Sequence, residues 1–281
     1  MFRRKYIHPE IAIGFVLLLL LASFAFLFPY LSNYTYEQTA LSSKNLTPSF
    51  THIFGTDDLG RDQAVRIAHG LQVSLLIGLL AAFLDLIIGV SIGSLSGYFG
   101  GLVDSILMSI TELFYSIPFL LAVLLVVTLL GPGVYSILLA MCFFGWIQMA
   151  RMSRIEVMRV KNSDAILAAH AIGIHPSRIF LFHIFPLISG SLITLLMQTI
   201  PHAIFIETFL SFLGIGIQPP LASLGSLVSD GLPAMRFYPH RLFYPSMVLS
   251  ITIFAFQLIS DGCRDLFDQK RLKSVEESSG I

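Results

Sequence analysis

The chain has 281 residues, of which 55% are hydrophobic and only 12% are charged. Soluble domains carry about 25% charged residues, so this composition indicates an integral membrane protein. The 17 basic and 17 acidic residues balance to zero net charge, which argues against nucleic-acid binding. The two cysteines, Cys142 and Cys263, lie in or near apolar runs and are expected to be buried structural thiols rather than parts of a disulfide or zinc framework.

The first apolar run, Ile11 to Phe28, holds 18 residues without a charge, which is long enough to cross a bilayer. It follows Arg3, Arg4 and Lys5. A secretory signal peptide also begins with basic residues, but its apolar region is usually shorter and a small-x-small cleavage site should follow. The residues after Phe28 are Pro29, Tyr30 and Leu31 and offer no such site. The sequence therefore predicts an uncleaved first span.

A polar segment, Tyr30 to Gly70, follows this span and contains the run from His52 to Asp62. The glycines and aspartates of this run are typical of turns. A metal site built from His52, Asp57 and Asp58 is the alternative, and we favour turn chemistry over it.

Five further apolar runs predict transmembrane helices, and Asp85, Glu112 and Glu207 are the acids within them. With the first span they make an all-α membrane protein of six transmembrane helices. We divide the chain into an N-terminal part (1–70), a five-helix core (71–265) and a tail (266–281). The fifth span is expected to be kinked or broken near Pro201. The five runs are Gln72–Tyr98, Ile106–Leu130, Val134–Ala150, Leu187–Leu210 and Phe243–Ser260.

Basic residues predict the orientation of these spans. If the N-terminus lies in the cytoplasm, 12 of the 17 lysines and arginines fall in inside segments and five in outside segments. An even number of spans then places both termini in the cytoplasm, together with residues 151–186. Four of the inside residues belong to the tail, namely Arg264, Lys270, Arg271 and Lys273.

Residues 151–186 predict two short helices joined by a turn. The first helix should cover Ala165 to Ile172, with the side chain of Asn162 or Ser163 as its cap. Gly173 suits the left-handed conformation in which helices end. Two prolines should start and limit the second helix, namely Pro176 and Pro186. Small side chains in the first helix allow another surface to approach closely, which favours a docking element.

Three intramembrane acids are the candidates for a polar path. Asp85 lies near the middle of its span, where a charge costs about 2.5–3.5 kcal/mol, so it should face the bundle interior or a partner. It either lines a path or is a protonated or hydrogen-bonded packing residue, and the sequence leaves both open. Glu112 and Glu207 lie nearer the span ends, where packing is favoured over contact with a substrate.

No motif points to chemistry within the chain itself. His170, His175 and His183 cluster in residues 151–186, but their spacing does not place them on one helix face, so a polar docking surface is favoured over a metal site. The sequence holds no G-x-x-x-x-G-K-[ST] phosphate loop and no Ser/His/Asp constellation that can be assembled. We expect no enzyme activity and no cofactor, and any ATP that drives the protein must bind to other subunits.

Several motifs resemble one family of membrane proteins. Ala168-Ala169-x3-Gly173 followed by His183-Ile184-Phe185-Pro186 resembles the cytoplasmic "EAA" loop of ABC importer permeases. Two departures are that the glutamate of this loop falls at Leu167 and that the often basic position before His183 is Phe182. Further runs resemble the "GTDxLGRD", "GYFGGxxD", "EaxLSFLGLG" and "GDxxRD" motifs of dipeptide, oligopeptide and nickel permeases, and they lie at residues 55–62, 98–104, 207–216 and 261–265.

The resemblance implies a type I ABC importer permease fold and a place in the prokaryotic cytoplasmic membrane. It implies a second permease as a heterodimer partner, two ATPase subunits and an extracytoplasmic peptide-binding protein. Peptides are favoured over nickel because no Met, His and Cys cluster suggests the handling of a soft metal. A proton-coupled carrier acting alone and a membrane enzyme or sensor are the rivals. The implied ATPase-coupling residues are Leu167, Ala168, Ala169, Gly173, His183 and Pro186.

Overall fold

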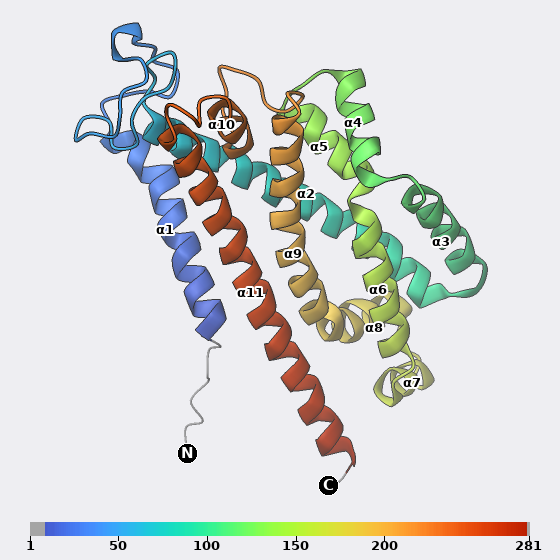
Figure 1. Cartoon of the computed structure of the whole chain (residues 1–281). Coiled ribbons are helices and arrows are strands. Elements are labelled where there is room, and N and C mark those ends of the chain that lie inside the picture. The colour runs from blue at the N-terminus through green and yellow to red at the C-terminus, as the bar shows by residue number, and fades with distance from the viewer. Residues whose placement is uncertain (1–8, 280–281) are drawn as a thin grey trace, which may run out of the picture.

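The computed structural model describes the backbone of residues 9–279 and the side chains of residues 9–267, which fold into a bundle of helices (Figure 1). The basic residues at positions 3–5, 270, 271 and 273, on which part of the predicted orientation rests, lie outside the described side chains. Within the described residues, five helices are long and apolar enough to span a membrane, or up to six if one bent pair of helices counts as a span. An all-α membrane protein is therefore confirmed.

The long helices follow the apolar runs of the sequence and extend beyond them. They are α1 (Pro9–Leu31), α2 (Gln63–Phe99), α9 (Phe185–Phe212) and α11 (His240–Ser279). Helix α9 runs unbroken through Pro201, so of the two predicted alternatives, a kink or a break, the break is wrong. Four N–H groups at the start of α2 need partners, and the carboxylate of Asp62 accepts one of them, from Val65, at 3.0 Å.

The third predicted span, Ile106–Leu130, is a bent pair rather than one straight helix. Helices α3 (Gly101–Tyr115) and α4 (Phe119–Leu130) meet at an angle of 76°. The break falls at Pro118, which has no N–H to donate and which disfavours helical backbone at the residue before it. Apolar composition alone could not show this bend.

The helix of the fourth predicted span continues beyond the predicted end of that span. Helix α5 (Val134–Phe144) passes through Gly145 into α6 (Trp146–Lys161), whereas the prediction ended at Ala150 because Arg151 is the next residue. Gly145 keeps helical backbone angles, and its N–H still bonds to the carbonyl of Met141 at 2.6 Å. A change from apolar to charged residues therefore does not end the helix here.

Three short elements connect α6 with α9. They are α7 (Asp164–Ala171), α8 (Pro176–Ile179) and a π turn (Phe180–Ile184) that runs directly into α9. Pro176 opens α8 as predicted, but Pro186 does not limit the helix that follows. In the π turn the N–H of Phe185 bonds to the carbonyl of Phe180, five residues back, and this wider turn lets the chain pass a proline that cannot donate.

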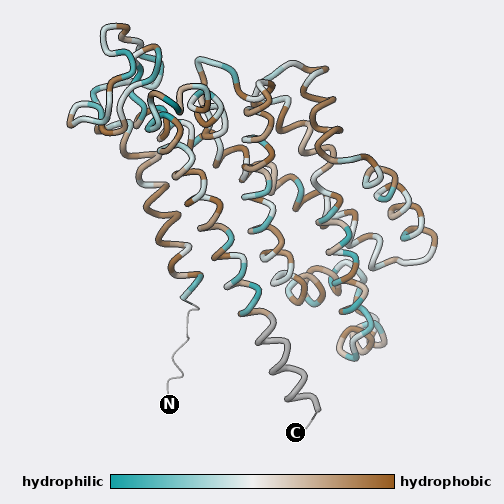
Figure 2. The backbone as a smooth tube through the Cα atoms, in the orientation of Figure 1, coloured by the Kyte–Doolittle hydropathy of each residue, from teal (hydrophilic) through white to brown (hydrophobic). Residues whose placement is uncertain are grey.

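The two ends of the bundle are built differently. The start of α1, the end of α11 and α7 lie at one end, which we call the α7 end (Figure 1). The loop of residues 32–62 and α10 (Leu224–Gly231) lie at the opposite end, which we call the loop end. Apolar residues run along the helices between these ends, while hydrophilic segments concentrate at the loop end and near α7 (Figure 2).

Close contact between α2 and α6 forms part of the bundle core. Gly89, Gly93 and Gly97 recur every four residues and therefore share one face of α2. A Cβ on Gly89 would lie 2.5 Å from the Cβ of Met149, and one on Gly97 would lie 2.8 Å from the carbonyl oxygen of Arg154. Only glycine permits this separation, as in other closely packed membrane helices.

The two cysteines are free thiols, and both are half-buried rather than fully buried. Cys142 belongs to α5 and Cys263 to α11. The prediction overstated their burial because an apolar run gives the depth of a helix in the membrane and not which of its faces turns toward the bundle.

Candidate functional site: the α7 segment and the Asp85 cavity

Helix α7 presents an apolar outer face. Leu167 is 53% exposed and Ile172, just after the helix, is 76% exposed, and Ala168 is exposed beside them. Ala169 turns inward, where it packs with Ile166 and Ile179 in a core cluster. The two neighbouring alanines of the motif therefore face opposite ways, and only Ala168 is available to a partner.

The backbone of α7 ends as predicted but does not begin as predicted. Gly173 has a φ of 77°, and its N–H bonds to the carbonyl of His170 at 3.0 Å. Ser163 occupies the N-cap position, yet its hydroxyl is buried without a partner. The carbonyl of Ser163 instead accepts the N–H of Leu167 at 3.0 Å, so backbone bonds alone close the first turn. Of the two predicted caps, Ser163 holds the N-cap position, but the predicted side-chain hydrogen bond is not formed.

The other two predicted coupling residues lie away from α7. His183 is half-buried on the π turn, and its Nδ1 is buried without a hydrogen-bond partner. Pro186 is exposed in the first turn of α9. The predicted ATPase-coupling residues therefore fall into two groups, one on or just after α7 and one on the π turn and the start of α9.

Tyr98 joins the end of α2 to the α7 segment. Its carbonyl accepts a hydrogen bond from the Lys161 ammonium at 2.5 Å, and its hydroxyl lies 3.4 Å from Nε2 of His170. Its ring meets that of Phe180 edge-on, with centroids 6.4 Å apart. His170, predicted to belong to a docking surface, therefore contacts the chain's own Tyr98.

An ion pair anchors the turn between α2 and α3 to α6. The guanidinium of Arg154 donates to both carboxylate oxygens of Asp104, which also accepts a short hydrogen bond from the hydroxyl of Ser96. Such two-pronged pairs fix geometry as well as adding stability. Arg154 does not stand out in the sequence, because its partner Asp104 lies on another helix.

A cavity of about 450 Å³ lies between α2, the α3–α4 bend, the α5–α6 junction and α9. Asp85 lines it and is only 3% exposed. Its carboxylate packs against Gly145, and its Oδ1 is buried with no hydrogen-bond partner. The other polar lining residues are Tyr115, Gln148, Gln198, Thr199 and His202. A buried acid without a partner inside a membrane protein is a candidate for function.

The two glutamates are not part of this cavity. Glu112 is exposed on α3. Glu207 is fully buried on α9, where its carboxylate accepts hydrogen bonds from Ser211 at 2.8 Å and from Ser74 at 3.2 Å. Ser74 in turn accepts the N–H of Leu224 at the start of α10, at 3.1 Å. The network around Glu207 therefore joins three helices and supports the packing interpretation.

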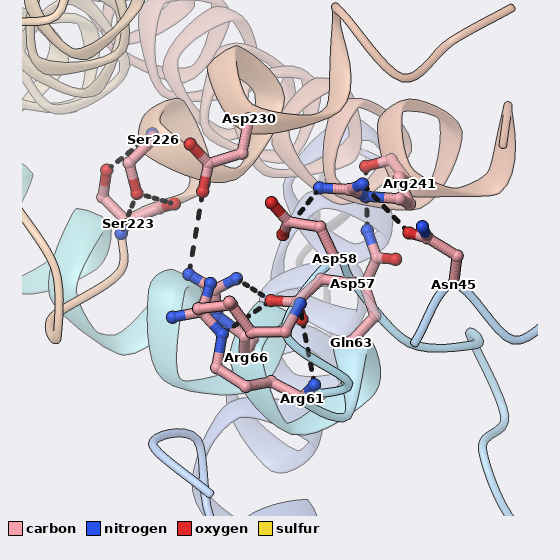
Figure 3. Close-up of polar contacts among 11 residues, drawn as sticks. Asn45, Asp57, Asp58, Arg61, Gln63, Arg66, Ser223, Ser226, Asp230 and Arg241 are labelled. Atoms are coloured by element: carbon pink, nitrogen blue, oxygen red, sulfur yellow. Dashed lines mark hydrogen bonds and ion pairs between the residues drawn. The ribbon is translucent and has the colours of Figure 1, made fainter. Parts of the chain in front are cut away.

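The run His52–Asp62 makes turns and also a buried charge cluster (Figure 3). Asp57 accepts the N–H of Leu59 at 2.9 Å, and Gly60 has a φ of 74°, as the turn interpretation requires. The same carboxylate accepts from the guanidiniums of Arg61 at 2.7 Å and Arg66 at 2.5 Å. Burial acts to raise the pKa of Asp57, but Arg66 and Arg61 outweigh it and lower that pKa below its ordinary value.

Arg241 ties the start of α11 to this end of the bundle (Figure 3). Its guanidinium donates to Asn45 and to Asp58, each at 3.2 Å, and its carbonyl accepts from the amide of Gln63 at 2.8 Å. Asp58, considered above as a metal ligand, is thus paired with an arginine. Arg66 and Arg241 do not stand out in the sequence, because their acidic partners are brought near only by folding.

Sequence comparison places the chain among known transport proteins. Residues 89–273 match the family described as "Binding-protein-dependent transport system inner membrane component". The oligopeptide transport system permease protein OppC of Bacillus subtilis (strain 168) is 44% identical over 261 residues, which are 93% of this chain and 86% of that protein. The dipeptide transport system permease protein DppC of the same organism is 42% identical over 258 residues, covering 92% and 81%. OppC of Escherichia coli (strain K12) is 39% identical over 271 residues, covering 95% and 90%.

Comparison with solved structures gives the same fold. A chain of the MetNI methionine ABC transporter, in an inward-facing conformation, superposes with a TM-score of 0.60 at 16% sequence identity. The match covers 72% of this chain and 96% of that one. At this identity the likeness shows the fold alone.

Proposed function

Because this chain belongs to the family of binding-protein-dependent transport system inner membrane components, we propose that it is the permease subunit of an ATP-driven importer of peptides. It is a multi-pass membrane protein, and the names of its relatives describe transport permeases rather than enzymes. The relatives' names, oligopeptide and dipeptide transport system permease, give the substrate class. This supports peptides over nickel as the substrate.

The exposed apolar face of α7 carries the proposal of a separate ATPase. Leu167 and Ile172 are large apolar side chains exposed at a hydrophilic end of the bundle, which is typical of a protein-binding surface. Two ATPase subunits would supply the nucleotide sites, one docked on this chain and one on its partner. A leucine at position 167, in place of the family's glutamate, makes this contact apolar rather than ionic.

Docking of a cytoplasmic ATPase on α7 would also fix the orientation of the chain in the membrane. The α7 end lies in the cytoplasm, with both termini, and the loop end faces outward in the cytoplasmic membrane of a prokaryote. An external binding protein would then deliver peptides to the loop end. The buried charge cluster around Asp57 supports this, because it gives the loop end a rigid surface against which a partner can dock.

A second permease would complete the transport path. A pocket of about 520 Å³ lies between α9 and α11 and is lined by polar groups that include Gln257, Ser260 and Asp261. Polar side chains within spans are costly to expose to lipid, so they favour a protein partner on this face. Gln198 and His202 line both this pocket and the Asp85 cavity, so the path would run along α9.

Movement at α7 would reach the cavity through physical contacts. Tyr98 connects α7 and the π turn to α2, and α2 carries Asp85. Arg154 connects α6, which leads into α7, to the turn after α2. Converting a 1:99 ratio of inward to outward states into 99:1 needs about 5.5 kcal/mol of differential binding, all of which must pass through this interface.

The experiment is purification of the tagged chain from gently solubilised membranes, followed by mass spectrometry and peptide uptake in proteoliposomes. We expect a second permease and an ATPase with a phosphate loop to co-purify. Ile172→Asp should lose the ATPase, whereas Leu59→Asp, an equally drastic change of an exposed leucine at the loop end, should keep it. A chain that purifies alone and transports peptides under a proton gradient would overturn the proposal in favour of the carrier.

A further inference from the structure

Asp85 is a buried acid that lines a cavity without a lysine or arginine to pair with it. It is the only lysine, arginine, aspartate or glutamate among the residues that line the 450 Å³ cavity. It is 3% exposed, and its Oδ1 has no hydrogen-bond partner. By contrast, Glu207 on α9 is fully buried, and its two oxygens accept hydrogen bonds from serine hydroxyls. The bundle can therefore satisfy a buried acid, and at Asp85 it does not.

Gly145, at the junction of α5 and α6, leaves space for the carboxylate of Asp85. A Cβ on Gly145 would collide with both carboxylate oxygens, so glycine at this junction keeps room for the acid. Gln148, one helical turn further on, and Gln198, on the facing helix α9, bring amide groups to the same cavity. An amide both donates and accepts hydrogen bonds, so it can pair with either group of a peptide bond.

We propose that this cavity is a subsite for the amino end of a peptide in transit. Asp85 receives the α-ammonium, and the amides of Gln148 and Gln198 bond to the first peptide group. The remaining wall includes Phe114, Phe119 and Met141, against which a first side chain of varied shape can rest. The inference deepens the proposed function and rests on it.

Other cations fit this cavity less well. A metal ion needs several ligands, and within the described residues no group of three or more His, Cys, Asp or Glu side chains is arranged to hold one. An ammonium needs only one carboxylate together with neutral acceptors, which the glutamine oxygens and His202 supply. The volume lies within the range of about 300–1,000 Å³ that small-ligand sites occupy.

The recognition would be selective for a free amino terminus and indifferent to sequence. Asp85, Gln148 and Gln198 would contact only the groups that every peptide shares, namely the ammonium, the N–H and the C=O. A transporter of peptides needs this kind of contact, since tight binding of particular side chains would trap some cargo within the membrane.

Photo-crosslinking in the complete transporter tests the subsite directly. Phe119, an aromatic residue in the cavity wall, is replaced by benzoylphenylalanine in the complex held in nanodiscs, without the binding protein. The probe is radiolabelled trialanine at millimolar concentration, either with a free amino terminus or N-acetylated. We expect the free peptide to label the chain about tenfold more than the acetylated one, as for loss of a hydrogen bond between charged groups.

Two variants make the outcome specific. In Asp85→Asn the preference for the free amino terminus should fall to about one, because the charge that selects the ammonium is gone. In Glu112→Gln, which changes an exposed acid outside the cavity, the preference should remain. Equal labelling by both peptides with Asp85 present, or no labelling by the free peptide, would overturn the inference.

Uptake measurements separate the two proposals. If the wild-type complex shows no ATP-dependent peptide uptake, the proposed function fails. If it takes up peptides while both probes label equally, only the subsite fails. With the subsite in place, Asp85→Asn should lower uptake of free peptides while the ATPase subunits still co-purify.

Discussion

The guanidinium of Arg154 donates two hydrogen bonds to the carboxylate of Asp104, from Nε to Oδ1 at 2.5 Å and from Nη2 to Oδ2 at 2.6 Å. The pair joins the start of α3 to α6 and so fixes the turn at the end of α2. Both side chains are partly shielded, at 29% and 18% exposure. The two parallel hydrogen bonds make this pair stronger and more directional than a single contact between opposite charges.

Arg154→Lys should therefore destabilise the chain, because an ammonium cannot reproduce the planar fork. We expect a loss of about 1 kcal/mol, discounted for the partial exposure of the pair, and a lower thermal midpoint in detergent. Arg159→Lys is the matched control on the same helix, since Arg159 is 50% exposed. Equal decreases of the thermal midpoint in the two variants would show that the two-pronged geometry of the Arg154–Asp104 pair adds no stability.

Asp57 should make stability depend on pH in the acid range. Its pKa is lowered in the folded state by Arg66 and Arg61, against the effect of burial, so its contribution is fully present above the ordinary value of 3.8. That contribution is lost as the pH falls below this value and through the lower folded pKa. Asp57→Asn leaves Arg66, 2% exposed, without its closest counter-charge and should cost about 3–5 kcal/mol at neutral pH.

The check on Asp57 is a series of unfolding measurements in detergent between neutral pH and pH 3. The difference between wild type and Asp57→Asn should shrink toward the acid end. Asp58→Asn is the control, because its side chain is 55% exposed. A difference that stays constant with pH would contradict the assignment of the effect to ionised Asp57.

Glu207 should prove structural. Glu207→Leu removes the acceptor for the hydroxyls of Ser74 and Ser211 in a fully buried site, so we expect a loss of about 2–5 kcal/mol. Glu207→Gln retains an acceptor and should cost less. Thermal unfolding and peptide uptake, measured together, distinguish the roles. Uptake that fails in Glu207→Gln at unchanged stability would instead indicate a residue of the transport path.

The two alanines of α7 should respond differently to the same substitution. Ala168→Trp changes an exposed position and should abolish ATPase binding and uptake, with the chain folded and inserted. Ala169→Trp overfills a core position that is 5% exposed and should lower stability by about 1–3 kcal/mol. Limited proteolysis and co-purification separate these effects. ATPase binding by Ala168→Trp at the wild-type level would refute the docking face.

Sequence patterns predicted local features well where one residue decides them. Gly173 ends α7 in the left-handed region and Pro176 opens α8, because each residue imposes its own backbone geometry. Pro118 and Pro186 look alike in the sequence, yet one breaks a span and the other sits within a continuous helix. The difference is the π turn before Pro186, which depends on packing against the rest of the bundle.

The candidate site was only partly predictable. Asp85 could be found because a charge within an apolar run is costly and therefore conspicuous. Gln148, Gln198 and His202 could not, since a polar residue in one helix gives no sign of which other helices it faces. The inward turn of Ala169 was equally hidden, because a motif gives spacing and not direction.

The sequence by itself determined that this is a helical membrane protein, in which stretches its apolar helices lie and, through its motifs, to which family it belongs. These properties depend on composition and on residues near one another in the chain. Only the tertiary structure decided that α3 and α4 bend, that Arg154 and Arg66 find their acids, and that Asp85 lies unpaired in a cavity. Such contacts join residues far apart in the chain, and they exist only once apolar packing has set the helices side by side.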